Sequence, residues 1–129
     1  MFFKKIVQKA LNQTWSKDET VKYVTDRTSE DQSSVISRLI YDIFGGEILK
    51  THFKNSWHFY NRIDGKRIDF SLARSNKSVS AISFEDIPSN PDEIHIYYQE
   101  EDYSNLFIRF IRIFEEVVGL KRYRFRIAA

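Results

Sequence analysis

The chain contains no cysteine among its 129 residues. This absence excludes disulfide bonds, zinc thiolate sites and thiol catalysis for the chain as written. Its three histidines, His52, His58 and His95, are scattered, and their spacing does not match that of a metal site. The sequence therefore predicts a protein without a metal ion or another cofactor.

Long hydrophobic runs, glycine-rich phosphate loops, internal repeats and low-complexity tracts are also lacking. The first seven residues include no apolar stretch long enough for a signal peptide or a membrane span. We therefore expect a cytoplasmic protein that does not enter a membrane.

The composition that is present is globular. Hydrophobic residues make up 42% of the chain and aromatic residues 16%, including 11 phenylalanines. A chain of this length can form one domain with a real core but not two. We therefore expect a single domain over residues 1–129. The net charge of +2 does not by itself predict a polyanionic partner.

Charge is distributed unevenly along the chain. Residues 80–104 contain seven acidic residues and no lysine or arginine, which predicts either a surface contact or a charge match inside the protein. Near the C-terminus, Arg122, Arg124 and Arg126 alternate with aromatic and aliphatic residues. Such a run can bind nucleic acid, but we favour an edge strand whose charges prevent aggregation.

Three segments have the apolar spacing of helices. They are residues 2–14, residues 33–44 before Gly45 and Gly46, and residues 103–118 before Gly119. The last one is apolar around most of its circumference, so we expect it to be sandwiched in the fold or packed against a partner subunit in a homo-oligomer.

The rest of the chain indicates short strands and loops. We expect an extended connection over 16–32, a strand over 47–54, a hairpin over 56–72, a polar loop over 74–80 and a loop over 87–92. Shorter strands are expected over 81–84, 94–98 and 122–127. The predicted class is α+β, with an antiparallel sheet packed against an N-terminal, a central and a C-terminal helix.

The hairpin organises this prediction. Asp64 and Gly65 favour a two-residue turn, which pairs Ile63 with Lys66, Asn61 with Ile68 and Phe59 with Phe70. By alternation, one face of the hairpin is apolar and the other polar. The predicted core face comprises Trp57, Phe59, Ile63, Ile68, Phe70 and Leu72.

The polar face places a histidine near a carboxylate. His58 and Asp69 become diagonal neighbours on adjacent strands, within side-chain reach of each other. A histidine oriented by a carboxylate is half of a nucleophile-activating triad. The alternative, which the pattern alone favours, is an ordinary solvent-facing strand surface. Its members are His58, Tyr60, Arg62, Arg67, Asp69 and Ser71.

Two serines lie at the predicted start of the central helix. Ser33 or Ser34 is expected to be its N-cap, the common role of serine there. The functional alternative is a nucleophile at the helix N-terminus, where backbone N–H groups and the helix dipole favour negative charge.

Several segments carry a resemblance to a known family. They are Thr14-Trp15-Ser16, Gln32 and the residue after it, Gly45-Gly46-Glu47-Ile48-Leu49, Trp57-His58-Phe59-Tyr60-Asn61, Ile63-Asp64-Gly65 and Ile68-Asp69-Phe70. Over residues 14–72 the chain resembles the YunG-like family of small bacterial proteins, which look like a minimal papain or transglutaminase-like fold.

The resemblance implies a triad in the transglutaminase-like order. Ser33 occupies the position of a cysteine nucleophile, Gln32 would stabilise the oxyanion, His58 would be the base and Asp69 would orient it. Three explanations fit the serine: a cysteine deliberately replaced, a natural loss of the nucleophile, or a working Ser-His-Asp triad.

The surroundings of Ser33 favour natural loss. Asp31 and Ser34 stand where the family pattern has glycines, and Asp31 adds negative charge where an oxyanion would develop. The expected function is a degenerate thiol-hydrolase-like domain that binds a protein or peptide in its cleft. The alternatives are an amidohydrolase (peptidase, deamidase or transglutaminase-type acyl transfer) and a nucleic-acid binder using the terminal arginines.

Overall fold

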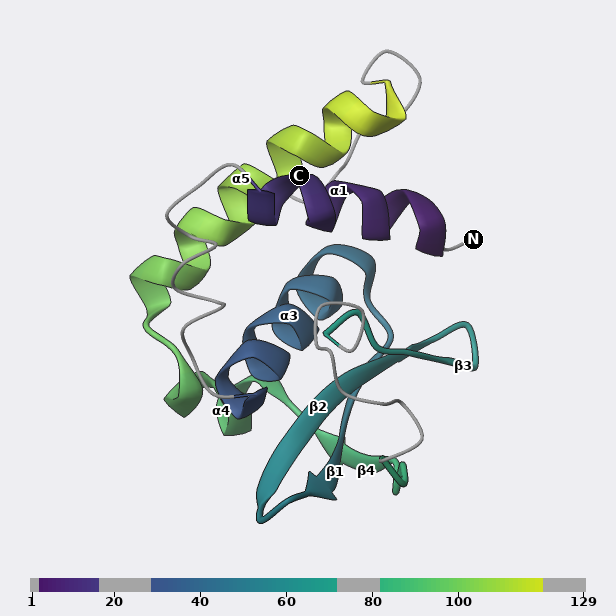
Figure 1. The fold of residues 1–129 in the computed structure, drawn as a ribbon, viewed down its shortest axis with the longest axis vertical. Helices are drawn as coiled ribbons and strands as arrows, with labels where there is room; N and C mark the ends of the chain where they lie inside the picture. Colours follow the sequence, from purple (N-terminus) through teal and green to yellow (C-terminus); the bar gives the residue numbers. More distant parts are fainter. Residues whose placement is uncertain (1–2, 17–28, 72–81, 120–129) are drawn as a thin grey trace.

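A computed structural model describes residues 3–16, 29–71 and 82–119. Within these residues the fold is α+β, as predicted, with a four-stranded antiparallel sheet in the order β3-β2-β1-β4 (Figure 1). The elements are α1 (Lys4–Ser16), α3 (Ser29–Phe44), β1 (Glu47–Phe53), β2 (Ser56–Ile63), β3 (Lys66–Ile68), β4 (Ile87–Ser89), α4 (Pro91–Ile94), the 3-10 helix η2 (His95–Tyr97) and α5 (Glu100–Val118).

The β2–β3 hairpin has the predicted register. Ile63 pairs with Lys66 and Asn61 with Ile68. Asp64 and Gly65 both have positive φ angles, 52° and 75°, as a type I′ turn requires. Strand β3 ends at Ile68, so the expected pairing of Phe59 with Phe70 does not form.

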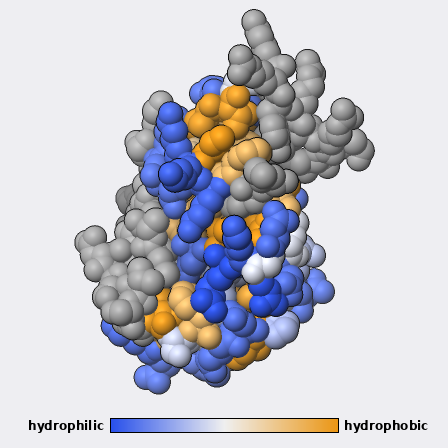
Figure 2. Space-filling view, turned by 90° about the vertical axis from the view of Figure 1, so that its right-hand side faces the viewer, coloured by the Kyte–Doolittle hydropathy of each residue, from blue (hydrophilic) through white to orange (hydrophobic). Residues whose placement is uncertain are grey.

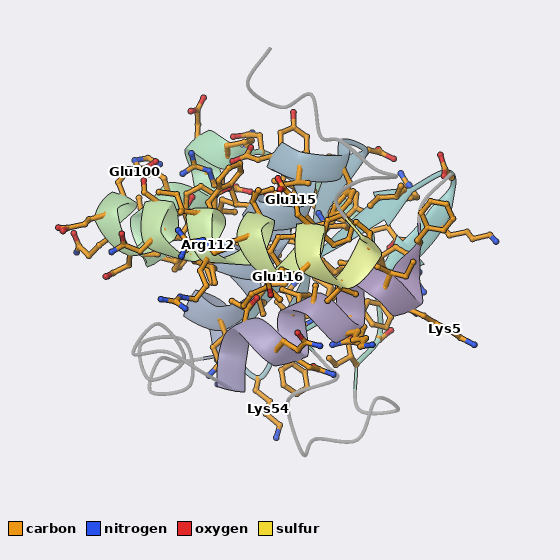
Figure 3. The ribbon with its side chains drawn as sticks, turned by 90° about the horizontal axis from the view of Figure 1, so that it is seen from above. Lys5, Lys54, Glu100, Arg112, Glu115 and Glu116 are labelled. Atoms are coloured by element: carbon orange, nitrogen blue, oxygen red, sulfur yellow. The ribbon has the colours of Figure 1, made fainter. Side chains whose placement is uncertain are left out.

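The core lies between the sheet and the helices. Phe59, Ile63, Ile68 and Phe70 are buried as predicted, whereas Trp57 is half-buried and Leu72 falls outside the described residues. Helix α3 packs directly on β2, and the long helix α5 lies along α1 on the far side of α3 (Figure 1). The buried residues of α1, α3, α5 and the sheet form one continuous cluster. Seen from above, Lys5 and Lys54 extend away from this body (Figure 3).

Helix α5 turns its apolar side inward, as one of the two sequence interpretations expected. Tyr103, Leu106, Phe110 and Phe114 are buried within the chain itself, while Ile108 is 57% exposed. The helix ends at Gly119, which has the predicted left-handed conformation. No helix among the described residues is long and apolar enough to cross a membrane.

Helix α3 begins four residues earlier than predicted, at Ser29 instead of Ser33. The N-cap role expected for Ser33 or Ser34 is therefore wrong, and both serines lie inside the helix rather than at its first residue.

The segment from 82 to 98 differs most from the prediction. Residues 82–86 form no regular strand, and residues 87–89 form the edge strand β4 instead of a loop. The strand expected over 94–98 does not form, because residues 94–97 are helical. The cause is local. The Asn90 side chain accepts a hydrogen bond from the Glu93 N–H and Pro91 occupies the first helical turn, a combination that starts a helix.

Several predicted elements cannot be compared. Most of the connection over 16–32, the loop over 74–80 and the terminal strand over 122–127, with Arg122, Arg124 and Arg126, lie outside the described residues.

Candidate functional site

His58 and Asp69 form a direct pair, as the hairpin pattern predicted. The His58 Nε2 atom lies 2.5 Å from Asp69 Oδ2, and the two side chains are only 6% and 7% exposed. Asp69 follows β3 immediately, so the shared face of the hairpin brings it to His58 on β2. This geometry excludes an ordinary surface histidine.

Ser71 holds the other side of the carboxylate. Its hydroxyl donates to Asp69 Oδ1 at 2.7 Å, so both oxygens of Asp69 have a partner. The sequence had placed Ser71 on the polar face of the hairpin without a role. Its position two residues after Asp69, on the same side of an extended chain, is the signal that could have identified this contact.

The polar face of the hairpin is covered around His58 and Tyr60, which corrects the prediction of a solvent-facing surface there, whereas Arg62 and Arg67 are partly exposed as predicted. His58 and Tyr60 are buried at 5% and 1% exposure. Residues 82–86, hereafter the strap, cross this face. The strap is bonded to Thr51, which is paired with His58 across β1 and β2, and to Tyr60. The strap therefore lies over Thr51, the partner of His58 on β1, and over Tyr60, two residues after His58 on β2.

Ser33 is brought to the same strand from the helical side. Its hydroxyl accepts a hydrogen bond of 3.0 Å from the backbone N–H of Phe59, the residue after His58, and Ser33 is 1% exposed. The Ser33 hydroxyl is thus bonded to the main chain of β2 at the residue next to His58.

The end of β3 explains this contact. In the observed register, Ile63 and Asn61 are the hydrogen-bonded positions of the hairpin, and Phe59 would be the next one. Because β3 stops at Ile68, the Phe59 N–H needs another acceptor, and the Ser33 hydroxyl supplies it. Ser33 therefore joins α3 to β2 at the point where the ladder ends.

Side-chain alternation separates Ser33 from the dyad. The Asn61 amide donates to the backbone oxygen of Ser37 in α3, so the Phe59 and Asn61 side of β2 faces that helix. His58 and Tyr60 point to the opposite side. Gln32 precedes Ser33 on α3 and is half-buried. The structure thus brings His58 and Asp69 together and places Ser33 and Gln32 at the adjoining strand edge.

Two carboxylates anchor the strap. Glu85 accepts hydrogen bonds from the His52 backbone N–H at 2.8 Å and from the Thr51 hydroxyl at 3.0 Å, and lies 3.0 Å from His52 Nδ1. These bonds, with the backbone donor of His52 contributing most, hold the Glu85 pKa below its ordinary value.

Asp86 is held in the same way. The Arg67 guanidinium donates to it at 3.0 and 3.2 Å and the Tyr60 hydroxyl at 2.8 Å, and these bonds lower the Asp86 pKa. Burial, reinforced by the bond to Asp86, raises the pKa of Tyr60. The sequence indicated Glu85 and Asp86 only as part of an acidic segment and did not predict their contacts with the sheet.

The charge match inside the protein, one of the two alternatives for that acidic segment, is observed. Glu93 pairs with Lys50 at 2.6 Å and Glu100 with Arg38 at 2.9 Å, in addition to the contacts of Glu85 and Asp86. Within the described ranges, no group of three or more histidine or acidic side chains could hold a metal ion.

Comparisons with known proteins give a consistent answer. The model of the YunG protein family matches residues 4–115. The Bacillus subtilis (strain 168) protein named "Uncharacterized protein YunG" is 37% identical over 106 residues, covering 82% of this chain and 90% of that protein. No solved structure matches. The match spans the hairpin, the strap and the His58–Asp69 pair, and the chain belongs to the YunG family.

Proposed function

We propose that this chain is a non-catalytic, degenerate member of a papain/transglutaminase-like group that works by binding a protein or peptide partner. Ser33, His58 and Asp69 are the remnant of a thiol triad, Gln32 is the remnant of its oxyanion-stabilising residue, and all four now support the fold. The observation that carries this proposal is the state of Ser33, whose hydroxyl is buried and bonded to the Phe59 backbone.

The chemistry of serine strengthens the argument. A serine hydroxyl needs a general base to take its proton during attack, and the base must be within hydrogen-bond reach. The Ser33 hydroxyl is directed at the backbone of β2, while the His58 imidazole points to the other side of that strand. A substrate carbonyl would also have to reach a serine that is 1% exposed.

An acyl-transfer enzyme is the second candidate function. The observation in its favour is the His58–Asp69 pair, because Asp69 binds Nε2 and leaves Nδ1 as the nitrogen that could serve a nucleophile. Such an enzyme would be an amidohydrolase acting through a Ser33-His58-Asp69 triad, with Gln32 at the oxyanion.

The surface does not favour one class over the other. Hydrophilic side chains cover much of the face shown in Figure 2, interrupted by separate hydrophobic patches.

Nucleic-acid binding through Arg122, Arg124 and Arg126 is a further proposal with its own assay. Salt-dependent retention on heparin would support it, and a lack of retention at low salt would remove it.

Electrophilic acyl-transfer probes, read by intact mass, separate binding from catalysis. The wild-type chain and three variants are compared: Ser33→Cys, Ser33→Cys with His58→Ala, and Ser104→Cys. Ser104 is exposed on α5, so its cysteine gives the rate of an ordinary surface thiol. We expect no labelling of the wild type and labelling of Ser33→Cys no faster than of Ser104→Cys.

Two outcomes contradict the proposal. Labelling of the wild type at Ser33 would make this chain a serine acyl-transfer enzyme. Fast labelling of Ser33→Cys that disappears with His58→Ala would mean that the triad geometry is intact and that only the nucleophile differs.

A further inference from the structure

The strap is bound to the sheet in the way that an extended peptide is bound by a receptor. Its backbone groups are held by side chains of two strands rather than by a strand ladder. The Thr51 hydroxyl donates to the Ser83 oxygen at 2.8 Å and accepts from the Glu85 N–H at 3.1 Å. The Tyr60 hydroxyl accepts from the Asp86 N–H at 2.7 Å. Main-chain recognition of this kind gives affinity that does not depend on sequence.

The side chains of the strap are recognised as well. The Phe84 ring packs edge-on against Tyr60, with ring centroids 4.9 Å apart, and the Arg67 guanidinium lies 4.4 Å from the Phe84 centroid. Arg67 also binds Asp86, while His52 binds Glu85. Thr51, His52, Tyr60 and Arg67 thus contact an aromatic residue of the strap and the two acids that follow it.

The strap is buried at Ile82, which is 8% exposed, but its other contacts are of kinds that another peptide could replace. Residues 82–86 form no β ladder, in contrast to the adjoining β4, which pairs with β1. Its two ion pairs are exposed to solvent: the side chains of His52 and Arg67 are 66% and 42% exposed. Exposed pairs contribute little to stability. Asp86 in addition has a φ of 58°, a left-handed conformation that costs energy for a residue with a side chain.

We propose that the strap is an internal ligand occupying a peptide-binding surface formed by Thr51, His52, Tyr60 and Arg67, and that the partner is an extended protein segment with an aromatic residue followed by two acidic residues. This inference rests on the proposed binding function and names its partner. The partner segment displaces the strap, and the strap keeps the surface closed in its absence.

Titration with the peptide Ile-Ser-Phe-Glu-Asp, acetylated and amidated, tests the proposal. A tethered strap competes at an effective concentration on the order of millimolar, so the wild type should bind the peptide weakly. Phe84→Ala with Asp86→Asn removes three strap contacts and should bind it at least tenfold more tightly. Amide chemical shifts report the site, and the peptide Ile-Ser-Phe-Gln-Asn is the matched control.

The variant with Phe84→Ala and Asp86→Asn is hereafter the loosened variant. Adding Arg67→Gln to it tests whether Arg67 belongs to the binding surface. It should reduce the affinity at least tenfold, because Arg67 contacts both the aromatic and the second acidic residue. Equal affinity of the wild type and the loosened variant, or equal affinity of the acidic and amide peptides, would overturn the inference. Those results would leave the non-catalytic function standing, whereas probe labelling of wild-type Ser33 would remove that function and not the peptide site.

Hydrogen exchange of the wild type keeps the test decisive if the loosened variant does not fold. The Glu85 and Asp86 amides should exchange at least tenfold faster than the amides of the β1–β2 ladder, because the strap opens on its own. Exchange of these two amides at the same rate as the ladder would mean that the strap leaves only when the protein unfolds, and the inference would fail.

Discussion

At the scale of single residues, the loss of a buried polar side chain should cost stability, because such side chains bond main-chain groups that would otherwise be unpaired. No buried side-chain nitrogen or oxygen among the described residues lacks a hydrogen-bond partner. Thr51, Asn61 and Ser33 are each at most 2% exposed, and each is bonded to the main chain of another segment. Such side chains replace the ladder partners that a short sheet cannot supply.

Ser33→Ala tests this role directly. Removing the hydroxyl leaves the buried Phe59 N–H without its acceptor, so the free energy of unfolding should fall by about 1–3 kcal/mol. Urea denaturation followed by circular dichroism measures the change. Ser104→Ala, at an exposed position of α5, is the control and should change stability by less than about 0.5 kcal/mol. Equal stability of the two variants would show that the bond is dispensable.

Only part of the candidate site could be predicted from the sequence. The His58–Asp69 pair followed from alternation about the Asp64-Gly65 turn, because a tight hairpin determines which side chains share a face. The partner of Ser33 did not follow. It depends on β3 ending at Ile68 and on α3 arriving at that edge, neither of which is a local property of the residues around Ser33.

At the scale of elements, the connection from α3 to β1 depends on a close backbone approach. Gly46 has a φ of 79°, and a Cβ atom at this position would lie 2.4 Å from the backbone oxygen of Arg62 on β2. Gly45 has a similar φ of 81° but open space around it. A substitution at Gly45 therefore measures the cost of the left-handed conformation alone, and a substitution at Gly46 adds the cost of the contact with Arg62.

Alanine substitutions at these two positions give a matched comparison. Gly45→Ala should destabilise by about 1–3 kcal/mol, the cost of a left-handed conformation for a residue with a side chain. Gly46→Ala should destabilise by about 1–3 kcal/mol more, because the β2 backbone must move. Thermal or urea denaturation measures both, and similar losses at the two positions would contradict the predicted contact.

The strap makes stability depend on pH. The Asp86 pKa is lowered by the hydrogen bonds of Arg67 and Tyr60. A carboxylate with a folded-state pKa below its unfolded value of about 4 stabilises the protein above that pH. This stabilisation is lost as the pH falls through the folded-state value. Because the Arg67–Asp86 pair is partly exposed to solvent, the wild type should lose only a small part of its stability below about pH 4.

Asp86→Asn measures this contribution. The variant should be less stable than the wild type at pH 7, and the gap should close as the pH falls below about 4, because protonation of Asp86 removes the same charge. Urea denaturation at several pH values gives the two curves. A gap that stays constant down to pH 2 would show that the charge of Asp86 does not stabilise the strap.

At the scale of the whole molecule, one core joins the two ends of the described chain. Helix α1 packs along α5, and their buried side chains belong to the same cluster as those of α3 and the sheet (Figure 1). A single continuous core predicts one cooperative unfolding transition.

Phe110→Ala tests that continuity. Phe110 is fully buried in α5, so its truncation should lower the free energy of unfolding by about 3–5 kcal/mol. Ile108→Ala, on the exposed side of the same helix, is the control and should have a much smaller effect. Far-UV circular dichroism and tryptophan fluorescence should give the same shifted midpoint. Two separate midpoints would mean that the helical layer unfolds independently of the sheet.

Local patterns in the sequence were enough to predict the class of fold, the three main helical segments and the hairpin. These depend on local chemistry: apolar spacing at 3.6 residues defines a helix face, and Asp64-Gly65 accepts the positive φ angles of a tight turn. The end of α5 was equally local, because Gly119 takes up the left-handed conformation that closes a helix.

Contacts between distant segments set the course of the strap and the environment of the dyad, whereas the helical turn that replaces the expected strand over 94–98 has a local signal at Asn90 and Pro91. Ile94, Ile96 and Tyr98 alternate like a strand, but Asn90 and Pro91 start a helical turn that buries Ile94 and leaves Ile96 71% exposed. The polar face of the hairpin became an interior only because the strap crosses it. Which surface a distant segment covers depends on the sum of contacts across the molecule, and spacing within one stretch of sequence does not contain that information.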